Sequence, residues 1–310
     1  MTPNSKIVNV FFVIVFLLQI NLINAQITKD EDTEIEKSYF KFSNSFLTND
    51  VYNGRQDSIV KPYIKPSIGY FDKSGFSTSV TGYYLTLANQ NRFDYFSFDM
   101  DYSYNLTPNL TTGITANRTF YNKSSTALKS SILGSLGANL GYDFGFIEIM
   151  TEANVLFSKK KDISLNIELL HEFTIGEDED DTNFVITPTF NIELNSLNYY
   201  EGYLNRKIGK KKAIAHPNIT SITSQVFVNN NHFSLLAYEA SVPVSYEFNN
   251  FVLFAIPTLA IPKTPIYTTT VTTTTTKAGV VTTVSKDSTP KSEYNLKNNF
   301  FAEIGLYYKL

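Results

Sequence analysis

The sequence predicts an all-β fold, namely a closed, antiparallel, up-and-down transmembrane β-barrel of about 12 strands. Three observations carry this prediction: segments of alternating character recur, the connections between them alternate in length, and aromatic residues gather at one end of the expected strands. The final segment alternates most clearly. Phe300, Ile304 and Leu306 would share one face, while Glu303 and Lys309 would share the other, because successive strand residues point to opposite sides.

Residues 1–25 predict a secretory signal peptide that precedes the fold. Lys6 supplies a positive start, residues 10–20 form an apolar run, and Ala25 is a small residue suited to cleavage. The apolar run is shorter than the roughly 20 residues that a spanning helix needs. We therefore expect a signal peptide at 1–25, a short periplasmic extension at 26–37 and the barrel at 38–310.

The composition limits which covalent links, metal sites and partners the chain can have. The chain has no cysteine, which excludes disulfides and cysteine-type zinc sites, and its three histidines lie far apart in sequence. We therefore expect no metal site and no cofactor. The net charge of −3 gives no reason to expect a nucleic-acid partner.

Alternating segments of a length suited to tilted transmembrane strands, about 9–11 residues, continue from Ser38 to the end of the chain. The eighth is the clearest, with Ile163, Leu165 and Ile167 on one face and Ser164 and Asn166 on the other. The expected strands are 38–47, 61–71, 76–88, 93–104, 110–120, 130–142, 145–157, 162–174, 183–196, 232–248, 251–261 and 299–310.

Short connections alternate with a set that includes the long ones. Outer-membrane barrels have short periplasmic turns and longer outer loops, so this pattern places both termini in the periplasm. The short turns are 72–75, 105–109, 143–144, 177–181 and 249–250, and the long connections are 48–60, 121–129, 197–231 and 262–298. Two outer connections, 89–92 and 158–161, are short.

The lower ends of the even-numbered strands carry aromatic residues in register with their apolar faces. Such a belt is typical of a membrane interface. Its members are Tyr70, Tyr102, Tyr104, Tyr142, Phe173, Tyr246, Phe248 and Tyr308. The alternative is a soluble, exported β-sandwich or barrel with its apolar face inward, but these faces hold more large aromatics than a small core accommodates.

The stretches 64–76 and 241–251, together with the final strand, resemble small outer-membrane β-barrels of Gram-negative bacteria, particularly uncharacterised barrels of the Bacteroidota. The final strand departs from that pattern at Leu310, a position that is usually aromatic in the family. The resemblance implies an outer-membrane location and a barrel architecture, and its motifs carry no known chemistry.

The polar faces of the expected strands hold a series of carboxylates, which cannot face lipid cheaply. They predict either a cation-preferring pore lining or a network that fills the lumen. We keep both interpretations, because a barrel of 12 strands is intermediate in size between small barrels filled by side chains and large barrels with an open channel. The lumen-facing candidates are Asp99, Asp101, Glu148, Glu152, Glu168, Glu172, Glu193 and Glu239.

Two basic outer segments predict contact with anionic lipid headgroups, including those of lipopolysaccharide, or else simply keep the loops soluble. Their members are Lys159, Lys160, Lys161, Arg206, Lys207, Lys210, Lys211 and Lys212. The acidic run 177–181 is read as a solvated turn or, alternatively, a divalent-cation site. The threonine-rich stretch 267–284 is expected to form a mobile tip or a β-hairpin above the barrel.

His232 and Ser234 form a His-x-Ser pair that resembles outer-membrane phospholipase A, in which the histidine acts as base and the serine as nucleophile. Parity would place both residues on the lipid-facing side with Leu236 and Tyr238. The sequence offers no matching orienting asparagine, so we expect no catalytic residues.

The expected function is therefore that of a non-catalytic, porin-like or structural surface protein. Its expected partners are outer-membrane lipids and small ions or solutes. The alternative is a binding or adhesion module that engages a surface partner through its long outer loops. A lipid hydrolase is the third and weakest reading.

Overall fold

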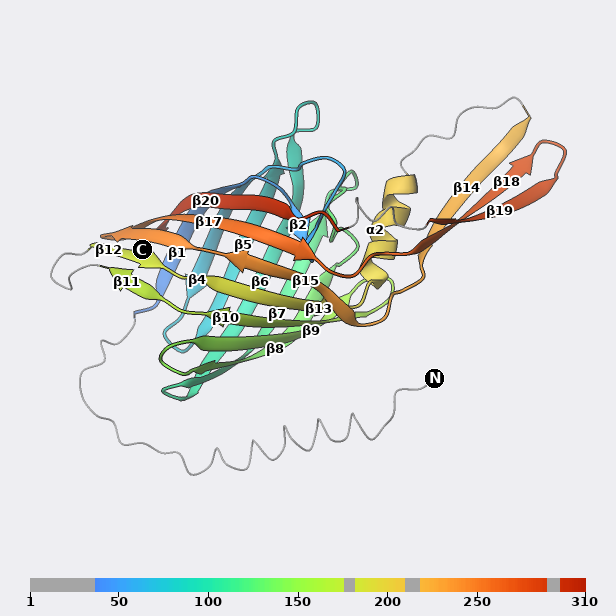
Figure 1. Ribbon diagram of the computed structural model, residues 1–310. Helices are drawn as coiled ribbons and strands as arrows, with labels where there is room; N and C mark the ends of the chain where they lie inside the picture. The colour runs from blue at the N-terminus through green and yellow to red at the C-terminus, as the bar shows by residue number, and fades with distance from the viewer. Residues whose placement is uncertain (1–36, 176–181, 210–217, 289–295) are drawn as a thin grey trace. The chain divides into compact units, whose positions relative to one another are not determined.

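The computed structural model describes residues 37–175, 182–209, 218–288 and 296–310. Within them the chain forms a closed antiparallel barrel of 12 strands, which confirms the predicted fold (Figure 1). The wall consists of β1 (Tyr39–Leu47), β4 (Tyr63–Phe71), β5 (Phe76–Leu85), β6 (Arg92–Thr107), β7 (Leu110–Tyr121), β8 (Gly134–Asp143), β9 (Glu148–Phe157), β10 (Asp162–Leu170) continued by β11 (Phe173–Ile175), β12 (Thr182–Ile186) continued by β13 (Thr189–Asn195), β15 (Ser234–Ser241) continued by β16 (Val244–Phe248), β17 (Phe251–Pro262) and β20 (Asn299–Lys309).

Two wall strands are interrupted at prolines. Pro188 separates β12 from β13, and Pro243 separates β15 from β16. Proline lacks the N–H that a strand ladder uses. Pairing nevertheless continues across both interruptions, because the carbonyl of Pro243 accepts the Thr187 N–H at 2.9 Å and that of Pro188 accepts the His171 N–H at 3.3 Å.

The first and last strands close the wall. β1 pairs antiparallel with β20, and Phe40 and Leu310 exchange backbone hydrogen bonds of 2.9 and 2.8 Å. Closure leaves no strand edge in the wall and satisfies its backbone polar groups internally, as a hydrocarbon environment requires.

The apolar face of the wall points outward. Phe300 is 68% exposed, Ile304 is 56% exposed and Ile163 is 58% exposed, whereas Glu303 on the opposite face bonds to side chains inside the barrel. An enclosed apolar centre would have buried these residues. The exterior is therefore the surface that a bilayer would cover.

The two ends of the barrel differ. Tyr39, Leu310 and the short turns lie at one end, hereafter the turn end, and the longer connections lie at the other, hereafter the loop end (Figure 1). This arrangement agrees with the predicted alternation of loop lengths. The expected signal peptide, most of the extension at 26–37 and the acidic turn 177–181 lie outside the described residues.

The loop end contains structure of its own. The connection after β1 holds a small hairpin of β2 (Val51–Tyr52) and β3 (Arg55–Gln56), and the long loop after β13 holds helix α2 (Asn198–Gly209) and β14 (Ile219–Val228). β14 pairs with β18 (Thr268–Thr276), which pairs with β19 (Val281–Ser288). The threonine-rich stretch thus forms the hairpin alternative, extended by a third strand. No helix in the described part of the chain is long and apolar enough to cross a membrane.

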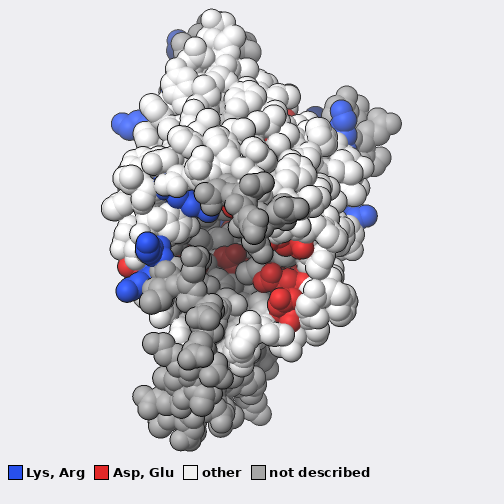
Figure 2. Space-filling view, turned by 90° about the vertical axis from the view of Figure 1, so that its left-hand side faces the viewer, with Lys and Arg blue, Asp and Glu red and all other residues white. Residues whose placement is uncertain are grey.

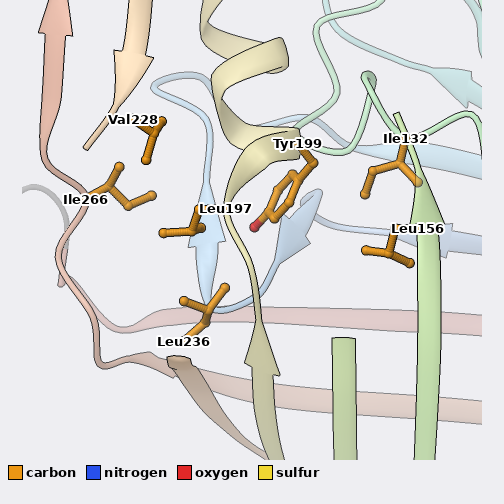
Figure 3. Close-up of a cluster of buried hydrophobic side chains, with 7 residues drawn as sticks. All are labelled: Ile132, Leu156, Leu197, Tyr199, Val228, Leu236 and Ile266. Carbon is orange, nitrogen blue, oxygen red and sulfur yellow. The ribbon is translucent and has the colours of Figure 1, made fainter. Parts of the chain in front are cut away.

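Buried apolar side chains collect at the loop end. One cluster joins Leu197 and Tyr199, at the start of α2, to the strand ends and loops around them (Figure 3). Its members are Ile132, Leu156, Leu197, Tyr199, Val228, Leu236 and Ile266. A second cluster comprises Tyr63, Leu85, Tyr95 and Ala127.

Candidate functional site in the barrel lumen

Carboxylates and amides alternate across the inner faces of neighbouring strands. Asn166 on β10 lies directly between Glu152 on β9 and Glu193 on β13. Like charges placed directly opposite one another destabilise a sheet. An amide between two carboxylates therefore lets one side of the barrel carry several acidic groups.

A cavity of about 440 Å³ opens against this side of the lumen. Every charged residue lining it is a carboxylate, and we call these four residues the acidic wall: Asp99, Asp101, Glu152 and Glu193. Among the described residues, no lysine or arginine lines this cavity. Amides and hydroxyls complete its polar surface, including Asn117, Asn154, Asn166, Asn195, Thr115, Ser135 and Ser164.

The other four candidate carboxylates, Glu148, Glu168, Glu172 and Glu239, lie outside this cavity. Glu168 and Glu239 flank Asn191, their shared cross-strand neighbour, and Glu239 also accepts the backbone N–H of Gly54. Glu148 begins β9 near the turn end, and Glu172 is exposed between β10 and β11.

The opposite side of the lumen has paired charges. A second cavity, of about 390 Å³, is lined by Lys41, Lys65 and Glu303. Lys65 and Glu303 form an ion pair of 2.7 Å, and the Lys41 ammonium lies 4.0 Å from the centre of the Tyr307 ring. Cations on this side are therefore held by a carboxylate or an aromatic face.

The acidic wall is compensated only through space, by Arg55 acting on Glu193 and by Lys129 acting on Asp99. The ion pairs found in the described part of the chain join six other acid–base pairs, and no member of the acidic wall takes part. Figure 2 looks onto the turn end and shows Asp and Glu gathered along one side of a hollow. The lumen thus presents an excess of negative charge on one side.

The β2–β3 hairpin lies inside the loop end. Asn53 and Gly54 form its tip, both with positive φ (49° and 72°), as an Asn-Gly hairpin turn requires. Asn53 donates to the Tyr199 hydroxyl at 2.9 Å, and the Gly54 carbonyl accepts from Asn299 at 2.7 Å. A Cβ at Gly54 would lie 2.7 Å from that of Ala237, so the tip packs tightly against the wall.

Charged groups anchor the hairpin and the residues that follow it. Arg55 donates to the carbonyls of Asn53 and Thr264. Asp57 forms ion pairs with Lys61, at 2.6 Å, and with Lys207 on α2. Burial alone would raise the pKa of Asp57, but hydrogen bonds from Lys207 and Lys61 hold it well below its usual range.

The segment 122–133 closes the adjoining part of the loop end. The Lys129 ammonium lies 5.8 Å from the centre of the Tyr83 ring and 5.6 Å from that of Tyr95, and its carbonyl accepts the Tyr121 hydroxyl at 2.9 Å. Burial lowers the pKa of Lys129 and raises that of nearby Asp50. We call the hairpin region 48–61, segment 122–133 and helix α2 together the plug.

The N-terminus of helix α2 is capped by a side chain of the wall. The two carboxylate oxygens of Asp162 accept the backbone N–H groups of Asn198, at 2.8 Å, and Tyr199, at 2.7 Å. A carboxylate at a helix N-terminus satisfies otherwise unpaired donors and favours the helix dipole. This contact fixes the helix at the rim of β10.

The basic residues of the outer segments have different surroundings. Lys159, Lys160 and Lys161 are exposed, and Lys160 forms an ion pair of 3.0 Å with Glu201. Lys207 binds Asp57 of the plug. Arg206 lies 6.0 Å from the centre of the Tyr121 ring. Lys210, Lys211 and Lys212 lie outside the described residues.

The expectation that His232 and Ser234 share a lipid-facing side with Leu236 is wrong. Leu236 is 0% exposed within the apolar cluster at the loop end. The register shifts by one residue opposite Glu193 and Leu194, which reverses parity beyond that point. The Ser234 hydroxyl is buried without a hydrogen-bond partner, so no histidine activates it.

Sequence reasoning missed the plug and the cavity residues Tyr52 and Asn195. The Asn53-Gly54 dipeptide, a strong hairpin signal, stood inside an expected loop and could have revealed β2 and β3. Nothing in the sequence indicated that this hairpin folds into the lumen.

No family model and no curated protein sequence matches the chain. Similar solved structures include the KdgM porin (TM-score 0.41, 10% identity, covering 87% of this chain and 99% of that one) and the NanC porin (TM-score 0.44, 10% identity, 87% and 100%). An outer membrane channel from Pseudomonas putida F1 is also similar (TM-score 0.34, 10% identity, 93% and 100%). At this level of similarity, we draw no functional inference from these structures.

Proposed function

We propose that this protein is a porin-like channel of a Gram-negative outer membrane that favours small cations and is closed, in the state described here, by its own plug. Both termini lie in the periplasm in this proposal. The stretches 64–76 and 241–251 favour a place among Bacteroidota barrels.

Two features support the membrane part of the proposal. The exterior of the wall is apolar, and aromatic residues mark the turn end, including exposed Tyr102, Tyr142 and Tyr246. The longer connections all lie at the loop end, which is the outer side in barrels of this kind. Exposed Lys159 and Lys161 at that end fit contact with lipopolysaccharide phosphates.

The observation that carries the cation preference is the unpaired acidic wall. Asp99, Asp101, Glu152 and Glu193 line one cavity to which the described part of the chain contributes no basic residue, while the opposite lysines are engaged with Glu303 or Tyr307. A lumen with a net negative potential concentrates cations and repels anions.

The test is conductance in planar bilayers under a KCl gradient. The wild-type channel is expected to show a reversal potential of cation-selective sign, and deletion of 49–60 is expected to raise its conductance. The variant Asp99→Asn/Glu152→Gln should move the reversal potential toward zero, whereas Asp287→Asn, in exposed β19, should not. A channel that is anion-selective, or insensitive to the paired substitution, would contradict the proposal.

A second candidate function is binding of a surface partner through the outer loops. It is favoured by the ordered sheet of β14, β18 and β19, in which every residue of β19 is exposed and one edge of β19 has no partner strand among the described residues. Exposed strand edges accept partner strands. Removal of residues 268–288 should then abolish partner capture at the cell surface while conductance is unchanged. Retention of every partner would exclude this function.

A further inference from the structure

We propose that the outward face of β7, β8 and β9 at the loop end binds the phosphate groups of an outer-leaflet glycolipid such as lipopolysaccharide, with Arg118 as the central ligand. We call Arg118, Lys123, Lys159 and Lys161 the basic rim. The inference rests on the proposed function, because that function places this face in the outer leaflet. It adds a defined lipid site on the wall itself.

Arg118 lies on the outward face of the wall. It pairs across the strands with Phe98 on β6, which is 39% exposed, and with Gly134 on β8. Its chain neighbours Asn117 and Thr119 face the lumen, where the Thr119 hydroxyl donates to Asn117 at 2.9 Å. Successive strand residues alternate between the two faces, so the exposed side chain of Arg118 is directed at the lipid.

The side chain of Arg118 leans toward the loop end. Its guanidinium lies 5.5 Å from the centre of the Phe120 ring, and Phe120 is two residues nearer to the loop end of β7 and 57% exposed. The cost of an arginine that faces lipid is greatest at the bilayer midplane and falls toward the interface. Long basic side chains near the ends of spanning segments extend to the headgroups for this reason. The position of the guanidinium therefore fits the level of the lipid phosphates.

The rim around Arg118 carries no surface carboxylate that could neutralise it. The ion pairs of the described residues do not include Arg118. The connections on either side, 122–133 between β7 and β8 and 158–161 between β9 and β10, contain lysines as their only charged residues. The acidic residue that follows, Asp162, is 0% exposed and caps α2. This part of the rim is therefore positive and needs a counter-ion from outside the chain.

Two of these lysines are engaged within the protein. Lys160 forms an ion pair with Glu201 of α2, and the ammonium of Lys129 lies near aromatic rings inside the loop end. The other three are exposed, and no ion pair of the described residues includes them: Lys123, Lys159 and Lys161. A phosphate at this rim can therefore meet several cationic groups that have no carboxylate partner.

Strand pairing brings the basic rim together around Gly134. Lys123 follows the end of β7 by two residues, and Lys159 follows the end of β9 by two residues. β8 lies between these strands, and its first residue, Gly134, pairs with Arg118 on one side and with Phe157 on the other. Neighbouring strands are about 4.8 Å apart, so β7 and β9 are separated by about 10 Å, a distance that the headgroup of a phosphorylated glycolipid spans.

The wall position beside Arg118 has no side chain. A Cβ at Gly134 would lie 2.4 Å from the carbonyl oxygen of Asn117, so a larger residue would require the backbone to shift. Phe98 and Phe157, both exposed, flank the pair on the adjacent strands. Acyl chains can pack against these rings while the phosphate meets the guanidinium. A free phosphate ion would gain nothing from the rings, which is why a lipid is the favoured ligand.

The two kinds of basic side chain have different roles in this site. A guanidinium binds phosphate through two parallel hydrogen bonds, whereas an ammonium acts as a point charge. Arg118 is therefore expected to orient the phosphate, and the lysines of the basic rim to add attraction. Replacement of Arg118 by lysine should keep the charge but lose the paired hydrogen bonds.

The test measures lipid binding to the detergent-solubilised barrel by native mass spectrometry. The probes are lipid A that carries two phosphates and the same lipid A after enzymatic removal of both. We expect the phosphorylated form to bind at least about tenfold more tightly, because charge-assisted hydrogen bonds distinguish the two. Arg118→Gln should weaken its binding about tenfold, and Arg118→Lys should weaken it less. Lys73→Gln, the same change of charge at the turn end, should leave it unchanged.

Inorganic phosphate in large molar excess distinguishes a lipid site from a site for the free ion. It should leave most of the phosphorylated lipid A bound, as chloride at the same ionic strength does, because it lacks acyl chains. Displacement of most of the lipid A by inorganic phosphate but not by chloride would overturn the assignment to a lipid.

Two further results would overturn the proposal. One is equal binding of the two forms of lipid A. The other is wild-type binding by Arg118→Gln in a barrel that is shown to be folded by its heat-modified electrophoretic mobility. If Arg118→Gln does not fold, the double variant Lys123→Gln/Lys159→Gln, in the connections, replaces it: weaker binding supports the site, and unchanged binding contradicts it.

Conductance measured on the same samples separates this site from the proposed channel. Cation selectivity without selective binding of phosphorylated lipid A removes the lipid site alone. Selective lipid A binding by an anion-selective or non-conducting barrel removes the channel and keeps the site.

Discussion

The ion-pair triad of Asp57, Lys61 and Lys207 is expected to hold the plug closed, and Asp57→Asn tests this. The substitution keeps the size of the side chain and removes its charge. The carboxylate is the shared partner of both ammonium groups. Its loss therefore leaves Lys61 as a buried charge without its counter-ion.

The expected size of the effect of Asp57→Asn follows from the burial of the Asp57–Lys61 ion pair. The side chains of Lys61 and Asp57 are 4% and 5% exposed, so their pair is shielded from solvent, while Lys207 is 37% exposed and contributes little. Removing one partner of a buried pair costs about 3–5 kcal/mol. At the lower figure, the ratio of open to closed channels should rise on the order of 100-fold, since Lys61 regains water when the plug moves.

Single-channel recording in planar bilayers measures this ratio directly. Asp287→Asn, a carboxylate of exposed β19, is the matched control and should leave gating unchanged. If Asp57→Asn channels stayed closed for the same fraction of time as wild-type channels, with the same protection of the hairpin from proteolysis, the triad would not be what retains the plug.

Three further predictions concern the plug and the wall. The pKa of Asp57 is depressed in the closed state, so the stabilisation that Asp57 gives the plug is complete above about pH 4, the ordinary range of an aspartate, and is lost as the pH falls toward the lower pKa. The open probability of the channel, measured in a pH series, should therefore rise only under acidic conditions. A rise at neutral pH would contradict this prediction. Leu236→Ala should destabilise the loop-end cluster by about 2–5 kcal/mol, seen as faster amide exchange in α2 with no change in β4–β8; equal exchange in α2 would argue against the cluster's role. Ile304→Arg should destabilise the barrel in lipid by about 2–4 kcal/mol, measured by urea unfolding from vesicles, whereas Ser67→Arg on the lumen side should be much milder; equal costs would reverse the assignment of faces.

The wall could be predicted closely from sequence, because its signal is local. Alternation with a period of two fixes which residues share a face, and it was preserved wherever a strand runs without irregularity. The final strand illustrates this: Phe300, Ile304 and Leu306 are all exposed, and Glu303 points into the lumen. Parity failed beyond register shifts. Near Glu193, one additional residue reversed the expected orientation of Ser234, and in β6 a shift leaves Phe93 44% exposed while Tyr95 is buried.

The plug could not be predicted in the same way, because its contacts join segments that are far apart in the chain. Asp57 meets Lys207 across 150 positions, and Asn299 reaches Gly54 across 245. No local sequence pattern predicts contacts between residues so far apart in the chain. The loop segments that form these contacts also lack the regular periodicity from which strands were predicted.

The sequence by itself determined that this chain builds a wall with an apolar exterior and an acidic, amide-rich interior, since alternation depends on neighbouring residues alone. Only the tertiary structure decided between an open and a filled lumen: the β2–β3 hairpin, segment 122–133 and α2 fold into the loop end and leave the acidic cavity beneath them. The physical reason is that burial and ion pairing of the plug depend on distances through space, which strand periodicity does not encode.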